Sequence, residues 1–189
     1  MEFVLATLLG IGLAASCGFR VFAPLLVASA ATYGGYLPLT AGFEWIGTLP
    51  ALSAFAVATL IETLAYYVPW FDNLLDTISS PLAVIAGMVL FAAAAIGLDP
   101  FLKWTLAIIA GGGSAAIVQG GTVFARGAST ATTGGLTNFV VSTFELVASV
   151  LFPLIAIVIP LAAVILLAIF VGTMYFAARR LARKFHPSE

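Results

Sequence analysis

Residues 138 to 178 read NFVVSTFELVASVLFPLIAIVIPLAAVILLAIFVGTMYFAA, an apolar run in which Glu145 is the only charged residue. A bilayer core of about 30 Å is crossed by roughly 20 helical residues, so this run is too long for one crossing. Pro153 and Pro160 interrupt or kink a helix, because proline lacks the backbone N–H and its ring clashes with the preceding turn. The run therefore predicts two membrane-spanning helices joined by a tight hairpin.

The composition of the whole chain fits a membrane environment. Of the 189 residues, 62% are hydrophobic and 8% are charged, and the mean hydropathy is +1.18. An ordinary soluble domain carries about 25% charged residues. We therefore expect an all-α integral membrane protein that forms a single membrane domain over residues 1–189. The six candidate spans are residues 3–33, 49–68, 81–98, 101–125, 138–157 and 160–178.

Basic residues gather at the C-terminal end of the chain, where Arg179, Arg180, Arg183 and Lys184 follow the last apolar stretch. Lys and Arg are enriched on the cytoplasmic side of membrane proteins. This bias predicts a multipass protein of the bacterial inner membrane, with its C-terminus and a tail over 185–189 in the cytoplasm. Counting back through six crossings places the N-terminus on the cytoplasmic side as well.

Two segments of the chain resemble each other. Residues 28–35 read ASAATYGG and residues 128–135 read ASTATTGG, and six of the eight positions agree. An apolar stretch with one acid, Glu62 or Glu145, follows each segment. The similarity predicts two repeats, over residues 1–98 and 99–184, with three helices each. An odd number of crossings per repeat inverts the second repeat relative to the first, as in many secondary transporters.

The first helix of each repeat contains residues that disfavour a continuous helix. Transporters of the inverted-repeat type bind solutes where helices are broken. Small residues also let membrane helices pack closely without any transport function, which is the alternative for each glycine alone. A helix over 3–33 would extend about 46 Å, so this stretch spans once, crosses twice or re-enters. In the last two cases each half could have four crossings, and the repeats would then be parallel. The predicted breaks are at Gly18 and Pro24 in the first repeat and at Gly120, Gly121 and Gly127 in the second.

Four ionisable residues fall within or beside the predicted spans: Arg20, Glu62, Arg126 and Glu145. Such residues are costly in a bilayer and usually face a cavity or a charged partner. In the functional interpretation, the two glutamates bind a cation or carry a proton, and the arginines supply counter-charges or hold an anionic group. In the structural alternative, Glu62 pairs with Arg20 and Glu145 pairs with Arg126, and both pairs fix the helix register.

Two further polar groups of residues are candidate binding sites. Gln119, Thr122, Ser129 and Thr130 offer amide and hydroxyl ligands for an ion or a polar solute, or for hydrogen bonds between helices. Asp72, Asn73 and Asp76 form an oxygen-rich loop that suits an entrance site for a divalent cation. Solvated acids beside a helix N-terminus are the alternative there. The sequence does not define the identity of a metal.

Signatures of enzymes and of nucleic-acid binding are absent from the sequence. The single histidine is His186 near the C-terminus, and the single cysteine is Cys17. A His-based triad, a zinc site or a CxxC redox pair cannot be assembled from these residues. There is no P-loop for ATP. We expect no enzymatic activity, no cofactor and no nucleic-acid partner; an acid–base enzyme that uses the two glutamates is the remaining enzymatic alternative.

Three segments together resemble a known family. They are GFRVFAPL at 18–25, ETLAYYVPWFDN at 62–73 and GGTVFARGAST at 120–130. The chain resembles a bacterial multipass membrane-protein family catalogued as a domain of unknown function, DUF4126. The resemblance covers nearly the whole chain and implies a small multipass protein, without an activity or a substrate. The three-plus-three layout is also similar to that of lysine-exporter transporters, although fold analogy does not establish function.

The expected function is that of a small secondary transporter or exchanger of an ion or a small polar solute. Coupling would be to protons or ions, and the pathway would lie at the repeat interface. The alternatives are a channel, a lipid-handling protein, and a structural or assembly protein that binds a partner through small-residue helix faces. Transport requires a polar cavity that reaches the surface, whereas the structural role predicts closed ion pairs. The expected partners are the lipid bilayer and the solute, and a bundle this small also allows a homodimer.

Overall fold

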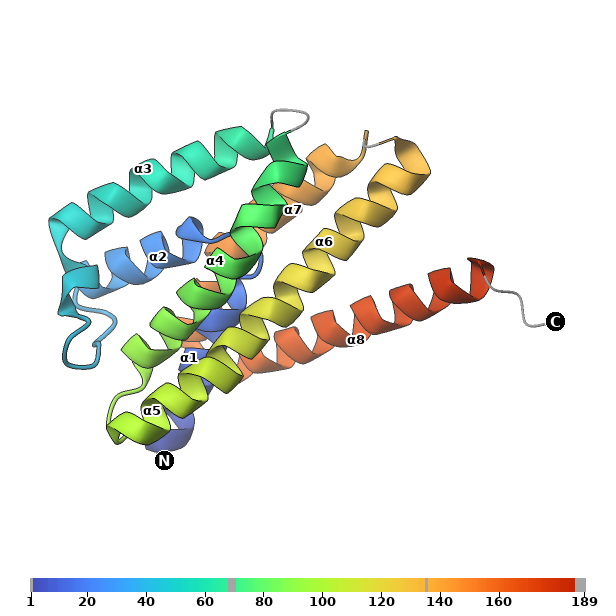
Figure 1. Cartoon of the computed structure of the whole chain (residues 1–189). Coiled ribbons are helices and arrows are strands. Elements are labelled where there is room, and N and C mark those ends of the chain that lie inside the picture. The colour runs from blue at the N-terminus through green and yellow to red at the C-terminus, as the bar shows by residue number, and fades with distance from the viewer. Residues whose placement is uncertain (1, 68–70, 135, 186–189) are drawn as a thin grey trace.

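The computed structural model describes residues 2–67, 71–134 and 136–185, with side chains for 3–67, 75–134 and 136–180. All regular elements within these residues are helical, which confirms the all-α prediction (Figure 1). The elements are α1 (Glu2–Ser16), α2 (Phe22–Tyr33), the 3₁₀ helix η1 (Glu44–Gly47), α3 (Leu49–Tyr66), α4 (Phe71–Ala94), α5 (Pro100–Leu106), the π-helical η2 (Ala107–Gly112), α6 (Gly113–Thr133), α7 (Asn138–Val158) and α8 (Pro160–Phe185).

Five helices in the described part of the chain are long and apolar enough to cross a membrane. Outward-facing apolar side chains on α3 and α8, such as Leu60, Leu64 and Ile169, provide surfaces that suit contact with lipid. These features agree with a multipass membrane protein, whereas the six-span layout is not confirmed. The five segments are Leu49–Tyr66, Leu75–Ala94, Pro100–Thr133, Asn138–Val158 and Pro160–Arg180.

The stretch that was predicted as one span, residues 3–33, forms two short helices instead. α1 has 15 residues and α2 has 12. At 1.5 Å per residue they extend about 22 and 18 Å, so neither crosses a core of about 30 Å. α1 packs beside the C-terminal half of α4, where a Cβ on Gly10 would lie 2.8 Å from the Phe91 ring. The segment after α2 returns to the same end of α4, because the Thr40 N–H donates to Ala93 O at 2.8 Å.

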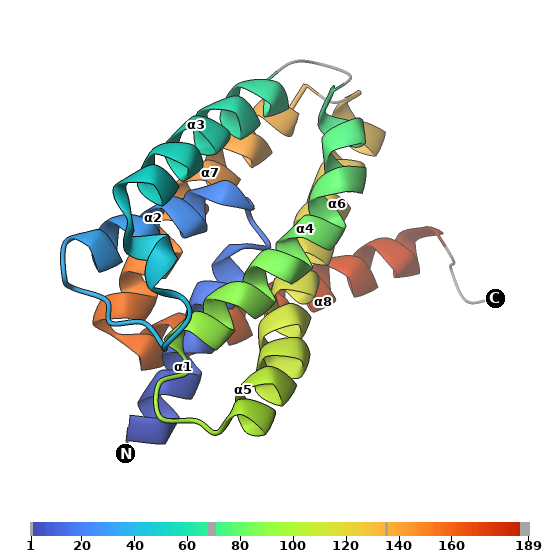
Figure 2. The ribbon, with the colours of Figure 1, turned by 60° about the vertical axis from the view of Figure 1, so that its left-hand side comes forward.

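α1 and α2 therefore form a hairpin that enters the bundle and returns to the end from which it started (Figure 2). α3, α5–α6 and α8 each run away from that end, and α4 and α7 run toward it (Figure 1). The start of α1 and the end of α8 consequently lie at opposite ends of the bundle. The prediction that both termini lie on one side of the membrane rested on residues 3–33 as one complete crossing, and the hairpin does not support that count.

The break between α1 and α2 occurs at the predicted position. The N–H groups of Cys17, Gly18 and Phe19 donate three residues back, at 3.0 to 3.1 Å, and this 3₁₀-like turn ends α1. A Cβ on Gly18 would lie 2.5 Å from Ala115 O, so only glycine permits this approach to α6. Pro24 lies in the first turn of α2, where an N–H has no intrahelical acceptor. It favours the start of α2 and does not itself break a helix.

The predicted breaks in the second repeat are wrong. α6 runs continuously from Gly113 to Thr133 through Gly120, Gly121 and Gly127. A glycine inside a helix costs only about 1 kcal/mol relative to alanine, which packing readily offsets. The irregular segment lies earlier, in the π-helical η2, which comprises residues 107–112.

The two similar segments both end a helix. Residues 28–33 form the end of α2 and residues 128–133 form the end of α6. Gly35 and Gly134 adopt positive φ angles of 77° and 65°, which favour glycine after a helix, although they occupy different positions of the two segments. Both segments thus end a helix, without the same backbone angles at matched glycines. The first elements of the two halves differ, since one is a hairpin and the other a single long helix from the same end of the bundle.

Candidate functional site

Six ionisable or aromatic side chains meet inside the bundle, away from the outer ends of α1 and α2. They come from the α1–α2 break, the end of α3, the start of α4, the second half of α6 and the first half of α7. Because α3, α4, α6 and α7 approach one another here, residues far apart in the sequence come together. We call this set the charge cluster: Arg20, Glu62, Tyr66, Asp76, Arg126 and Glu145.

Arg126 joins three helices through its guanidinium group. It forms an ion pair with Asp76 on α4 and another with Glu145 on α7. The exposed fractions of the side chains are 4% for Arg126, 1% for Glu145 and 13% for Asp76. Removing one partner of such a buried group leaves an uncompensated charge, which is strongly destabilising. Arg126 is therefore the electrostatic centre of the cluster.

Arg20 reaches the same region from the α1–α2 break. Its Nη2 donates to Ser142 O on α7 at 3.1 Å, and its guanidinium lies 3.8 Å from the centroid of the Tyr66 ring. The Arg126 guanidinium lies 4.3 Å from the centroid of the same ring. The Tyr66 hydroxyl donates to Asp76 Oδ1 at 3.3 Å. Cation–π contacts with one ring thus hold two arginines close together in spite of their like charge.

Within the described residues, Glu62 binds backbone N–H groups and forms no ion pair with an arginine. Its carboxylate accepts hydrogen bonds from the N–H groups of Val21 at 2.8 Å and Phe22 at 3.0 Å. These groups open α2, whose N-cap residue makes no side-chain cap of its own. A carboxylate is favoured there by unpaired N–H groups and by the helix dipole. The predicted pairing of Glu145 with Arg126 is therefore present, whereas the described contacts give Glu62 a different partner from Arg20.

Four buried polar atoms of the cluster have no hydrogen-bond partner among the described residues: Arg20 Nε, Arg20 Nη1, Arg126 Nε and Glu145 Oε1. Most buried polar groups in proteins are hydrogen-bonded, so these atoms call for an explanation. Three of the four are N–H donors on cations. The cluster therefore offers more donors than acceptors to an additional group.

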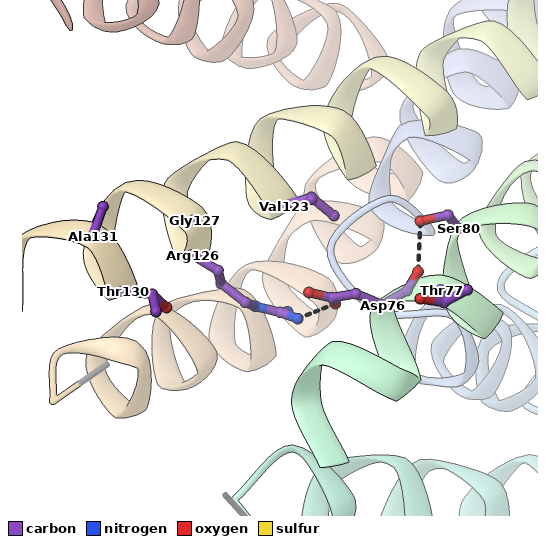
Figure 3. Close-up of a pocket in the computed structure, with 8 residues that line it drawn as sticks. All are labelled: Asp76, Thr77, Ser80, Val123, Arg126, Gly127, Thr130 and Ala131. Atoms are coloured by element: carbon purple, nitrogen blue, oxygen red, sulfur yellow. Dashed lines mark hydrogen bonds and ion pairs between the residues drawn. The ribbon is translucent and has the colours of Figure 1, made fainter. Parts of the chain in front are cut away.

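A groove of about 550 Å³ between α4 and α6 leads from the surface to the Arg126–Asp76 ion pair (Figure 3). Figure 3 shows Arg126 and Asp76 directed toward each other across it, while Thr130 and Ala131 lie further along α6. Ser80 Oγ donates to Asp76 O at 2.7 Å within the groove wall. The groove is lined by Asp76, Thr77, Ser80, Val123, Arg126, Gly127, Thr130 and Ala131.

The remaining predicted polar residues divide into two sets. Thr130 lines the groove, and Gln119 Nε2 donates to the groove residue Ser80 at 3.4 Å. Thr122 Oγ1 donates to Gln119 O at 2.9 Å within its own helix. Ser129 Oγ lies 2.6 Å from Thr137 Oγ1, where the chain turns from α6 into α7. Thr122 and Ser129 are thus engaged in local bonds, although sequence spacing had grouped them with the other two.

The predicted entrance site is divided as well. The backbone of Asp72 and Asn73 belongs to α4, but their side chains lie outside the described residues. Asp76 belongs to the charge cluster and pairs with Arg126. Within the described residues there is no group of three His, Cys, Asp or Glu side chains that could hold a metal ion. The role of Asp76 was missed because its sequence neighbours suggested a loop.

Fold and site together define a small polytopic α-helical membrane protein with a buried charge cluster at a helix break. The chain belongs to the family described as Domain of unknown function (DUF4126), whose family model matches residues 7–180. This match confirms the resemblance found from the three sequence segments. No curated protein and no solved structure shows significant similarity to the chain.

Proposed function

We propose that this protein is a secondary transporter or exchanger of an ion or small polar solute in the bacterial inner membrane, coupled to protons or ions. The observation that carries the proposal is the groove between α4 and α6. It connects the surface with the Arg126–Asp76 pair, and Arg126 is also bound to Glu145. A purely structural cluster would be closed, whereas a polar cavity that reaches the surface is what transport requires.

The break between α1 and α2 supports the same proposal. Discontinuous helices in transporters bring helix termini and backbone groups to the substrate site near the middle of the membrane. Here the break contributes Arg20 to the charge cluster, and the N-terminus of α2 binds Glu62 of the same cluster. Irregular backbone at this depth is tolerated where protein groups satisfy it, as Glu62 does for Val21 and Phe22.

The directions of the later helices in the two halves support a position for the pathway. The α3–α4 pair and the α7–α8 pair run in opposite directions, as expected for the later parts of inverted repeats. The charge cluster draws residues from α3, α4 and α7. We place the pathway between the two halves, along the groove between α4 and α6, with the end of α8 and its basic residues in the cytoplasm and the start of α1 on the other side.

Lipid handling is the second candidate function, because the groove lies between two apolar helices and Thr77, Ser80 and Thr130 are among the residues that line it. A headgroup could enter such a groove without leaving the bilayer. This alternative predicts exchange of lipid between leaflets and no flux of soluble ions, so one reconstituted sample separates the two.

The test is a flux assay in proteoliposomes with a pH-sensitive dye and a panel of cations and small anions. Glu145→Gln removes the charge of a 1% exposed carboxyl that pairs with Arg126. Glu44→Gln is the matched control, because Glu44 is an exposed acid in η1. We expect solute-dependent proton movement in the wild type and in the control, and its loss in Glu145→Gln protein that thermal unfolding shows to be folded. Absence of flux for every solute in verified, oriented vesicles would refute transport.

A further inference from the structure

We infer that the solute is a small anion, which binds at the break between α1 and α2 to the Arg20 guanidinium and the N-terminus of α2. The inference rests on the proposed transport function and adds the class of substrate. The charge cluster contains three carboxyl groups, Glu62, Asp76 and Glu145, and their number alone would favour a cation. The choice of an anion rests instead on the unpartnered donors of Arg20 and on the N-terminus of α2.

The Arg20 guanidinium has unused binding capacity. Its side chain is 1% exposed and its Nη2 is bonded to Ser142 O, but Nε and Nη1 have no partner in the described part of the chain. A guanidinium offers five N–H donors in a rigid fork, which matches the oxygens of an oxyanion. The ring of Tyr66 at 3.8 Å and the bond to Ser142 O fix the orientation of this fork.

The N-terminus of α2 is a second anion-binding group, and a carboxylate already occupies it. The two oxygens of Glu62 accept from Val21 N and Phe22 N at 2.8 and 3.0 Å. This is the arrangement in which helix N-termini bind free carboxylates and phosphates. The carboxylate comes from a different helix, and the N-cap residue of α2 supplies no side-chain cap. In our proposal an incoming anion takes the place of this carboxylate.

Charge balance then links anion binding to a proton. With every group ionised, two arginines and three carboxylates leave the cluster with one net negative charge. A second negative charge in a poorly hydrated site is unfavourable unless one carboxyl takes up a proton. Glu62 is that carboxyl in our proposal, because protonation weakens its hold on the two N–H groups that the anion needs. One monovalent anion and one proton would bind together, with no net charge added.

The neighbours of Glu62 agree with this assignment. The other two carboxyl groups are held by Arg126, whereas Glu62 has no arginine within ion-pair distance among the described contacts. Its protonation therefore breaks no ion pair. The titratable and charged groups that act on it are Cys17 and Arg20 in the break and Arg126 on α6. Tyr66, Asp76 and Glu145 contact these two arginines or each other.

The test is calorimetric binding to the full chain in lipid nanodiscs, with acetate, nitrate, chloride and inorganic phosphate as probes and with Na⁺ and K⁺ at equal ionic strength. Uptake of one proton with the anion makes the affinity of the wild type fall by up to about tenfold per pH unit above the titration range of Glu62. Glu62→Gln should remove most of this pH dependence, since the amide is neutral throughout.

Variants of Arg20 test the second binding group. We expect Arg20→Gln to weaken anion binding by at least about tenfold, the effect of losing one charge-assisted hydrogen bond. Arg20→Lys should recover part of the affinity, because it keeps the charge and loses the fork. Arg179→Gln is the control, as Arg179 is an exposed cation in α8. A thermal unfolding curve for each variant establishes that it is folded.

The outcomes separate the inference from the proposed function. Anion binding that depends on pH and on Arg20 supports the inference, and it does so even if no flux is observed, in which case transport alone is refuted. Flux of a cation with no anion binding to the folded wild type overturns the inference and leaves transport intact. Anion binding that is unchanged in Arg20→Gln and in Glu62→Gln also overturns it, because the site would lie elsewhere.

Discussion

Replacing Arg126 with glutamine should destabilise the protein through the carboxylate that it leaves behind. Glu145 is 1% exposed and loses its cation, whereas Asp76 at 13% retains some contact with water. Removing one partner of a buried ion pair costs about 3 to 5 kcal/mol. In a chain of this size, 1 kcal/mol corresponds to roughly 2 to 4 °C in Tm, so Arg126→Gln should lower Tm by roughly 6 to 20 °C.

The sole cysteine provides the assay. Cys17 is fully buried in the α1–α2 break, so a thiol-reactive fluorogenic dye reports its exposure on unfolding. The double variant Arg126→Gln/Glu145→Gln removes both charges and should recover at least half of the lost Tm, because the unpaired carboxylate is gone. The reasoning fails if Arg126→Gln changes Tm by less than about 2 °C, or if the double variant is no more stable than the single one.

Two further predictions concern the hairpin. Gly18→Ala should destabilise the protein by about 1 to 3 kcal/mol, since the added Cβ would lie 2.5 Å from a backbone atom of α6. Gly120→Ala is the control, and it should be neutral or slightly stabilising because nothing lies within 4 Å of its Cβ position. Thermal unfolding of the two variants measures the difference. In a Cys17→Ser background, Val4→Cys and Tyr36→Cys should react with a membrane-impermeant maleimide from the same side, because α1 and α2 have their outer ends at one end of the bundle. Labelling from opposite sides of the membrane would contradict the hairpin and support a single crossing by residues 3–33.

The helical elements and several boundaries could be predicted from local signals. Thr48 accepts from Ala51 N with Pro50 in the first turn of α3, and Asp99 accepts from Phe101 N and Leu102 N ahead of α5. Such caps depend on neighbouring residues and can be read from the sequence. The hairpin formed by residues 3–33 could not be predicted in this way. Hydropathy indicates that a segment is apolar enough for lipid, but it does not indicate whether the chain crosses the membrane or turns back to the same side.

The site was predicted in part for a similar reason. Single ionisable residues in apolar surroundings stand out, so Arg20, Glu62, Arg126 and Glu145 were found. Their partners depend on which helices meet, and this is decided by packing over long sequence separations. Asp76 follows a polar segment and was grouped with Asp72, yet it lies 50 residues from its partner in the ion pair. The pairing of Glu62 with backbone N–H groups has no sequence signature at all.

The hairpin has a consequence for the way in which the protein is made. The carboxylate that satisfies the first N–H groups of α2 is synthesised 41 and 40 residues after them, and the carbonyl that Arg20 binds follows it by 122 residues. Unsatisfied backbone groups are costly in lipid, so we expect the hairpin to reach its final position only after the acceptors on α3 and α7 have been translated. A substitution at Glu62 or near Ser142 can therefore lower the yield of correctly inserted chains before it affects any property of the finished bundle.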